Sequence, residues 1–146
     1  MEKMKSINDI ASFLEKRGQK IKPLNWDAIE SIEDKFAVTL PLVYKEFLRL
    51  MGDGAGEYMK GSSVFFNELF LLEQWTTELI LENNIPHLPP GSFVFWMHQG
   101  YQAAYFTLDD GDDPPVFLFS EGDDNDGFEL VENSLTKFFL TQLESM

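Results

Sequence analysis

The sequence FVFWMHQGYQAAYFTL at residues 93–108 indicates the fold class more clearly than any other part of the chain. Two apolar and aromatic runs, Phe93–His98 and Tyr101–Leu108, flank a Gln99-Gly100 pair. A two-residue connection with glycine second is typical of a type I′ β-hairpin, because both of its residues need a positive φ. The strand pairs that this register predicts are Val94–Tyr105, Trp96–Ala103 and His98–Tyr101.

The two faces of this hairpin differ in character. The face expected to point into the core is more uniformly apolar and carries Phe93, Phe95, Met97, Gln102, Ala104 and Phe106. The other face carries Val94, Ala103 and four aromatic residues with a polar group, Trp96, His98, Tyr101 and Tyr105. Such side chains are common in binding hot spots, so these four are candidate partner-binding residues. The alternative is that a helix covers this face and buries them.

The sequence on either side of the hairpin predicts further helices and strands. In most of these segments, a capping residue or Pro41 comes first, and apolar residues at helical spacing follow it. The predicted helices are Ser6–Lys16, Asn25–Phe36, Pro41–Met51, Glu73–Asn83 and one from about Ser134 to Leu143. The predicted strands beyond the hairpin are Ser63–Phe66, Val116–Phe119 and Phe128–Val131. Together they predict an α+β fold with a mainly antiparallel, twisted sheet flanked by helices.

Composition predicts one domain over residues 1–146, with 44% hydrophobic residues and 14 Phe to form a core. Because the chain has no Cys, disulfides and Cys-ligated zinc are excluded. The N-terminal residues lack the apolar run of a signal peptide, and no apolar run is long enough to cross a bilayer. We therefore expect a cytoplasmic protein that does not contact membranes directly.

Charge is unevenly distributed along the chain. Residues 1–60 hold 10 Lys/Arg and 10 Asp/Glu, whereas residues 61–146 hold 15 Asp/Glu and only Lys137. The second part therefore carries the whole net charge of −14, which should repel nucleic acid and attract a basic protein domain. The alternative is that this acidity serves solubility alone.

Acidic residues concentrate in two predicted loops, which we expect to steer a basic partner. They are Asp109, Asp110, Asp112 and Asp113 in the first loop, and Asp123, Asp124 and Asp126 in the second. The second loop resembles part of an EF-hand, but Gly122 and Asn133 occupy the positions where the motif needs ligands. We therefore predict no metal site.

No sequence motif supports catalysis or cofactor binding. The glycines at Gly52–Gly56 fit neither a Walker loop nor a dinucleotide-binding loop, and are better explained as a helix stop and a loop. Neither His87 nor His98 lies in a hydrolase motif. We therefore predict no catalytic residue, no cofactor and no enzymatic activity.

The order of these signals resembles the SUKH superfamily, and more specifically its Smi/Knr branch. The resemblance rests on Ile29–Glu33, Leu40–Leu48, the Gly52–Gly56 loop and the 95–101 hairpin, followed by Pro115–Phe117 and Leu135–Leu143. It covers the chain from about Ile21 to the end. One departure is Met51-Gly52-Asp53, where the family often has Asn-Gly-Gly.

This resemblance implies an α+β fold without an active site. Bacterial members of the superfamily are regarded as immunity proteins that bind and neutralise toxins, often nucleases. Fungal members act as scaffolds in cell-wall glucan synthesis signalling. Our leading hypothesis is therefore an immunity protein that binds a basic, nuclease-type toxin domain, and the alternative is a Smi/Knr-type regulatory scaffold.

Overall fold

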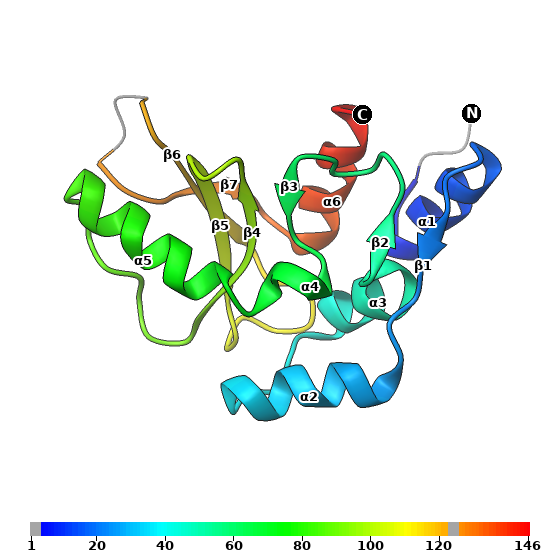
Figure 1. Cartoon of the computed structure of the whole chain (residues 1–146), viewed down its shortest axis with the longest axis horizontal. Helices are drawn as coiled ribbons and strands as arrows, with labels where there is room; N and C mark the ends of the chain where they lie inside the picture. Colours follow the sequence, from blue (N-terminus) through cyan, green and yellow to red (C-terminus); the bar gives the residue numbers. More distant parts are fainter. Residues whose placement is uncertain (1–3, 123–125) are drawn as a thin grey trace.

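The structure, a computed structural model, describes residues 4–122 and 126–146 (Figure 1). Its first part contains three helices, α1 (Ile7–Lys16), α2 (Trp26–Phe36) and α3 (Leu42–Met51). The predicted caps are confirmed, since Ser6 Oγ accepts a hydrogen bond from the Asp9 backbone N–H and Asn25 Oδ1 accepts one from that of Ala28. These side chains satisfy amide groups that the first turn of a helix leaves without a partner.

A small sheet that the sequence did not predict links the first part to the rest. Strand β1 (Ile21–Lys22) pairs with β2 (Gly54–Ala55), so the stretch expected to be a loop contains a short strand. Gly52 before it ends α3, and a Cβ there would lie 2.7 Å from the Leu48 carbonyl oxygen. Only glycine therefore allows the chain to leave α3 at this angle.

The main sheet is antiparallel, with five strands in the order β3-β4-β5-β6-β7. The strands are β3 (Ser62–Ser63), β4 (Ser92–His98), β5 (Gln102–Thr107), β6 (Val116–Ser120) and β7 (Glu129–Glu132). The remaining helices are α4 (Phe66–Leu69), α5 (Leu72–Asn83) and α6 (Leu135–Glu144). The prediction for Ser63–Phe66 was wrong beyond Ser63, because the chain turns there into α4. The α+β class and the antiparallel sheet are confirmed.

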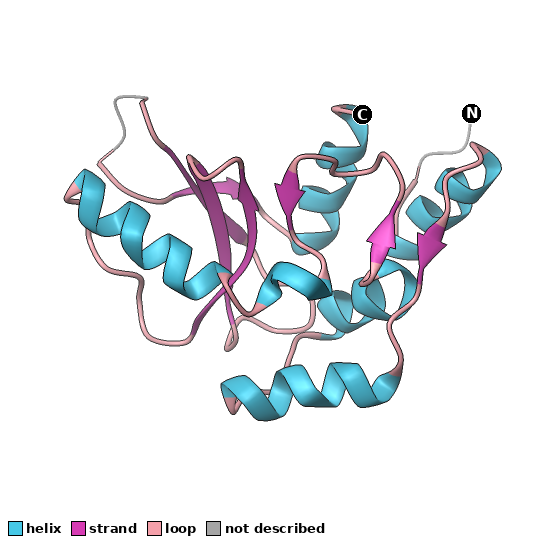
Figure 2. Ribbon diagram, in the orientation of Figure 1, coloured by secondary structure: helices cyan, strands magenta, loops and turns pink. Residues whose placement is uncertain are grey.

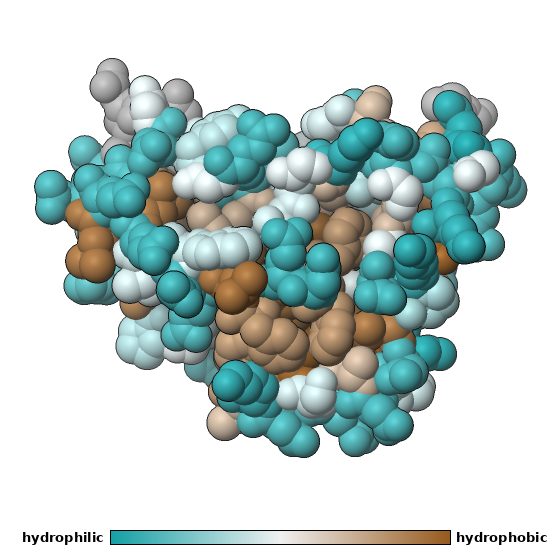
Figure 3. Space-filling view, in the orientation of Figure 1, coloured by the Kyte–Doolittle hydropathy of each residue, from teal (hydrophilic) through white to brown (hydrophobic). Residues whose placement is uncertain are grey.

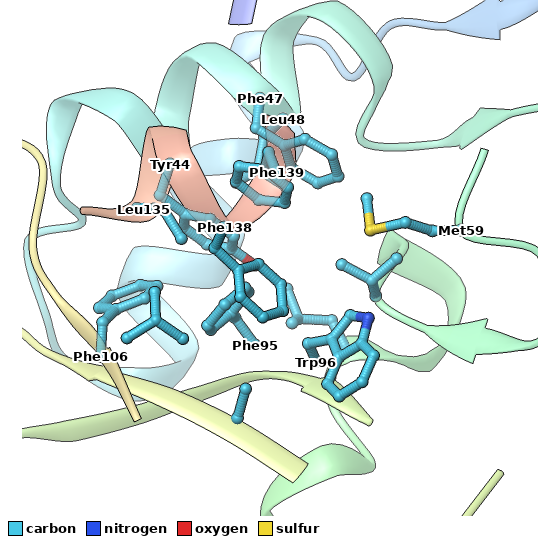
Figure 4. Close-up of a cluster of buried hydrophobic side chains, with 14 of the residues drawn as sticks. Tyr44, Phe47, Leu48, Met59, Phe95, Trp96, Phe106, Leu135, Phe138 and Phe139 are labelled. Carbon is cyan, nitrogen blue, oxygen red and sulfur yellow. The ribbon is translucent and has the colours of Figure 1, made fainter. Parts of the chain in front are cut away.

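Helices cover the two faces of this sheet unequally (Figures 1 and 2). Helix α5 lies against one face, while α3 and α6 lie toward the other. On the α3/α6 side, Phe47 of α3 stacks on Phe139 of α6 with ring centroids 4.4 Å apart. Tyr44, next to them, contacts Phe95 and Phe106 of the sheet (Figure 4). This aromatic cluster is the centre of the core.

The hairpin turn forms as predicted, but the strands beyond it do not pair as predicted. Gln99 and Gly100 both have positive φ, and the Tyr101 N–H donates to the His98 carbonyl oxygen at 3.2 Å. Val94 pairs with Tyr105 as expected, whereas Trp96 pairs with Ala104 and His98 with Gln102. An irregularity between Val94 and Trp96 places one extra residue, Phe95, in β4.

This bulge reverses the faces on which the aromatic residues lie. Trp96 points toward α6, where its ring meets Phe138 edge-on at 5.5 Å. Tyr105 lies on the opposite face, stacked on Phe117 at 5.1 Å. The expectation that Tyr105 shares a face with Trp96 and His98 was therefore wrong. Trp96 and Tyr105 are both buried, as the alternative interpretation of this face requires.

Candidate functional site

A groove lies between α6 and the end of the sheet that carries the hairpin turn. Its volume is about 540 Å³, and we call it the α6 groove. All five main-sheet strands, the connection between β2 and β3, and α6 contribute to its walls. The lining residues that matter below are Ser62, Trp96, His98, Gln102, Glu132 and Gln142.

At the end of the sheet that carries the hairpin turn, four polar side chains form a row across four adjacent strands. Ser62 pairs with His98, His98 with Gln102, and Gln102 with Ser120. Ser62 Oγ and His98 Nδ1 are hydrogen-bonded at 3.0 Å, and Gln102 Nε2 donates to Ser120 Oγ at 3.3 Å. Because cross-strand partners lie on the same face of a sheet, these four side chains form one continuous polar strip.

An aromatic layer lies next to this row. Trp96 and His98 stack with centroids 5.9 Å apart, and Tyr101 packs edge-on against His98 at 5.8 Å. Trp96 is 3% exposed and Tyr101 is 38% exposed, so the layer runs from the core to the surface. Three of the four aromatic residues predicted to bind a partner therefore lie together here, although Trp96 and His98 are on the face expected to point into the core.

Two buried polar atoms of the α6 groove make no hydrogen bond with any residue that the structure describes. One is the indole Nε1 of Trp96, a donor, and the other is Oε2 of Glu132, an acceptor. In Figure 4 the nitrogen of Trp96 lies on the side of its ring toward Met59, which also lines the groove. Unpaired buried polar atoms are uncommon in proteins and call for a physical explanation.

The charged side chains that line the α6 groove leave one negative charge without a partner. Lys60 Nζ lies 3.3 Å from Glu57 Oε2, and both side chains are well exposed. Glu132 has no ion pair among the residues that the structure describes. A ligand of this groove that carries positive charge would therefore be favoured.

A second hollow lies on the other side of the turn, against α5. It has a volume of about 440 Å³ and is lined by Trp75, Glu78, Glu82, Met97 and Gly100 among others. No Lys or Arg lines it. Both hollows at the turn end of the sheet therefore favour positive charge.

A different exposed surface is apolar. Figure 3 shows it between α4 and α2, where Phe70 stacks on Phe36 at 5.7 Å and meets Phe66 edge-on. Its lining is aromatic and, unlike the α6 groove, it offers no charged group among these three residues.

Comparison with known families identifies the chain. The profile of the SMI1 / KNR4 family (SUKH-1) matches residues 23–141, which include α2, α3, the main sheet and most of α6. The chain belongs to the SMI1/KNR4 family. This confirms the resemblance to the SUKH superfamily that the sequence suggested. No curated protein matches the chain.

Membership of the SMI1/KNR4 family supports a function of the Smi/Knr or immunity type, and the family is generally non-catalytic. Residues 4–122 and 126–146 contain no group of three or more His, Asp or Glu side chains placed to hold a metal ion. None of the helices in this part of the chain has the length and apolarity that a membrane span requires.

The aspartates of the β5–β6 connection lie at the far end of β5 from the turn. A six-residue strand separates these ends by about 20 Å. Asp113 accepts hydrogen bonds from the backbone N–H and the hydroxyl of Thr136 at 2.9 and 2.8 Å, in the first turn of α6. Asp110 accepts one from the hydroxyl of Thr107. The structure therefore does not bring these acidic residues together with Trp96 and His98.

The remaining acidic residues predicted to bind a partner are either exposed or outside the described part of the chain. The side chains of Asp109 and Asp112 are exposed in the β5–β6 connection. Asp126 is exposed in the connection that leaves β6 at the turn end of the sheet. Asp123 and Asp124 lie outside the described residues.

Sequence reasoning missed Ser62, Gln102 and Glu132 as members of the site. Ser62 and Glu132 lie far apart in the chain and have no motif around them, so only the fold brings them together. Gln102 did offer a signal, since it was the single polar residue on a hairpin face expected to be apolar. A polar residue at an expected core position often indicates a functional site.

Proposed function

We propose that this protein is a non-catalytic, cytoplasmic binding module that neutralises a toxin domain by occupying its basic surface. The observation that carries this proposal is the charge of residues 61–146, where 15 Asp/Glu accompany a single Lys. Nuclease toxins need basic surfaces to hold phosphate groups. An acidic protein that covers such a surface excludes the nucleic acid.

We place the binding surface at the turn end of the sheet. Tyr101 is exposed there, and Glu78 and Glu82 border the hollow on the α5 side. An exposed aromatic residue can provide contact area, while the surrounding carboxylates increase the association rate at low salt. The arrangement therefore supplies both a steering field and a candidate hot spot.

The proposal is tested by co-expression with a nuclease-type toxin domain encoded by a neighbouring gene. We expect the protein to restore growth of cells that express the toxin, and to inhibit the purified nuclease at a one-to-one ratio. A variant with Glu78→Lys and Glu82→Lys should protect less well, and Asp34→Lys on α2 is a matched control. Undiminished toxicity with the wild-type protein present would contradict the proposal.

A Smi/Knr-type regulatory scaffold is the alternative, and the family match is the observation that favours it. A scaffold should bind several unrelated proteins, whereas an immunity protein should bind one toxin tightly. Affinity purification at low and high salt distinguishes the two, since a single partner retained at high salt is expected only of the first.

A further inference from the structure

We infer that the α6 groove receives one guanidinium group, supplied by an arginine side chain of the protein partner. This inference rests on the proposed function, because it names a chemical feature of the protein that binds. It goes beyond that function by assigning a specific pocket and a specific side chain.

Two unsatisfied buried atoms of the α6 groove point to such a guest. Trp96 Nε1 can only donate a hydrogen bond, and a carboxylate oxygen of Glu132 can accept one. Neither Trp96 Nε1 nor Glu132 Oε2 is exposed to solvent, so bulk water does not replace the missing partner. A guest that carries both N–H donors and a carbonyl oxygen supplies both missing bonds, and an arginine residue has this combination.

The hydrogen-bond acceptors on the walls of the groove favour a guanidinium group over an ammonium group. Gln102 uses its amide nitrogen on Ser120, and its amide oxygen accepts no hydrogen bond from the described residues. Gln102 and Glu132 therefore offer two acceptors on the walls of one groove. A planar group with several N–H donors matches several acceptors better than the compact ammonium of lysine does.

In the part of the chain that the structure describes, the chain's own cations near the groove do not pair with Glu132. Lys60 is paired with Glu57 and its side chain is 74% exposed. Lys137 lines a small neighbouring hollow with Glu132, but the two form no ion pair within 4.0 Å among the described residues. The charge of Glu132 is therefore available to a guest.

Binding requires a small rearrangement at the rim. Because the two unsatisfied atoms are shielded from solvent, side chains that line the groove must move before a guest reaches them. Changes of side-chain rotamer are common when proteins bind partners, whereas the backbone of an interface usually moves little.

The test uses Nα-acetyl-argininamide as the probe and the whole chain as the receptor. The indole N–H resonance of Trp96, assigned with Trp96→Phe, reports on the groove, while that of Trp26 on α2 serves as an internal reference. We expect a saturable shift of the Trp96 resonance, and none of the Trp26 resonance, at roughly millimolar probe. The lysine analogue should bind more weakly, and the uncharged citrulline analogue roughly tenfold more weakly.

Two variants separate charge recognition from nonspecific attraction to an acidic protein. Glu132→Gln keeps the shape of the groove and should weaken binding roughly tenfold, with the melting temperature unchanged or raised. Asp34→Asn removes an exposed carboxylate on α2, away from the groove, and should leave the shift unchanged. Equal binding of the citrulline analogue, retained binding in Glu132→Gln, or an unshifted Trp96 resonance would each overturn the inference.

The same variant distinguishes this inference from the proposed function. If Glu132→Gln protects cells as well as the wild type does, and the probe does not bind the wild-type protein, the groove assignment is wrong and the immunity function stands. If the wild type fails to protect but the probe binds through Glu132, the immunity function is wrong. The groove then remains a guanidinium site.

Discussion

The two halves of the sheet face that points toward α3 and α6 differ in covering and in chemistry. At the end near the β5–β6 connection, Phe93, Phe95 and Phe106 pack against Tyr44 of α3 and are almost fully buried. At the turn end, His98 and Gln102 belong to a polar row that borders an open groove. The strands β4 and β5 run through both halves. Stability and partner binding should therefore depend on different residues of the same strands.

The largest effect is expected in the covered half. Phe47→Ala removes a fully buried ring that stacks on Phe139 at 4.4 Å, and should lower the free energy of unfolding by roughly 3–5 kcal/mol. Urea denaturation followed by circular dichroism measures this difference. A loss below about 1 kcal/mol would show that α3 does not hold this half of the sheet as described.

Asp113 tests whether the acidic connection has a structural role. Asp113→Ala removes two hydrogen bonds from the first turn of α6 and should lower the free energy of unfolding by about 1–2 kcal/mol. Asp112→Ala is the matched control, since its side chain is exposed, and should change stability by less than about 0.5 kcal/mol. Equal effects of the two variants would argue against a special role for Asp113.

Two fully buried tyrosines form a matched pair. The Tyr58 hydroxyl donates to the Phe139 carbonyl oxygen at 2.6 Å, whereas that of Tyr44 has no partner among the described residues. Burial raises the pKa of both phenols, so both remain neutral at physiological pH. Tyr58→Phe should lower the free energy of unfolding by about 1 kcal/mol, and Tyr44→Phe should raise it by a similar amount. Thermal unfolding of both variants would show opposite signs, and a shared sign would contradict these hydrogen-bond assignments.

The smallest effect on stability is expected in the open half. Gln102→Ala removes a partly exposed side chain from the polar row, and should change the free energy of unfolding by less than about 0.5 kcal/mol. Phe106→Ala, on the same face of the same strand, should lower it by roughly 3–5 kcal/mol. If Gln102→Ala were comparably destabilising, the turn end would be part of the folding core.

The sequence predicted features that depend on local interactions and missed those that depend on packing. The caps at Ser6 and Asn25 and the turn at Gln99-Gly100 each depend on residues a few positions apart, and the structure confirms them. The position of Trp96 depends on the bulge at Phe95, which allows both aromatic rings to pack on Phe138 of α6. No local pattern indicates such a bulge.

The candidate site was predictable to a similar extent. Aromatic character identified Trp96, His98 and Tyr101, because large amphipathic rings are suited to binding wherever they lie. Acidic character could not separate a steering charge from a structural one. Asp113 and Asp126 look alike in the sequence, yet Asp113 holds the first turn of α6 and Asp126 is exposed near the turn end.

The measurement that tests the central claim most directly is the kinetics of partner binding by variants from the two ends of β5. Against the toxin domain, surface plasmon resonance at two salt concentrations should show that Tyr101→Ala increases the dissociation rate roughly tenfold or more. Asp109→Asn with Asp112→Asn should slow association, mainly at low salt, and leave dissociation unchanged. Unchanged dissociation for Tyr101→Ala together with faster dissociation for the aspartate pair would contradict the account, because it would place the binding surface at the opposite end of the sheet.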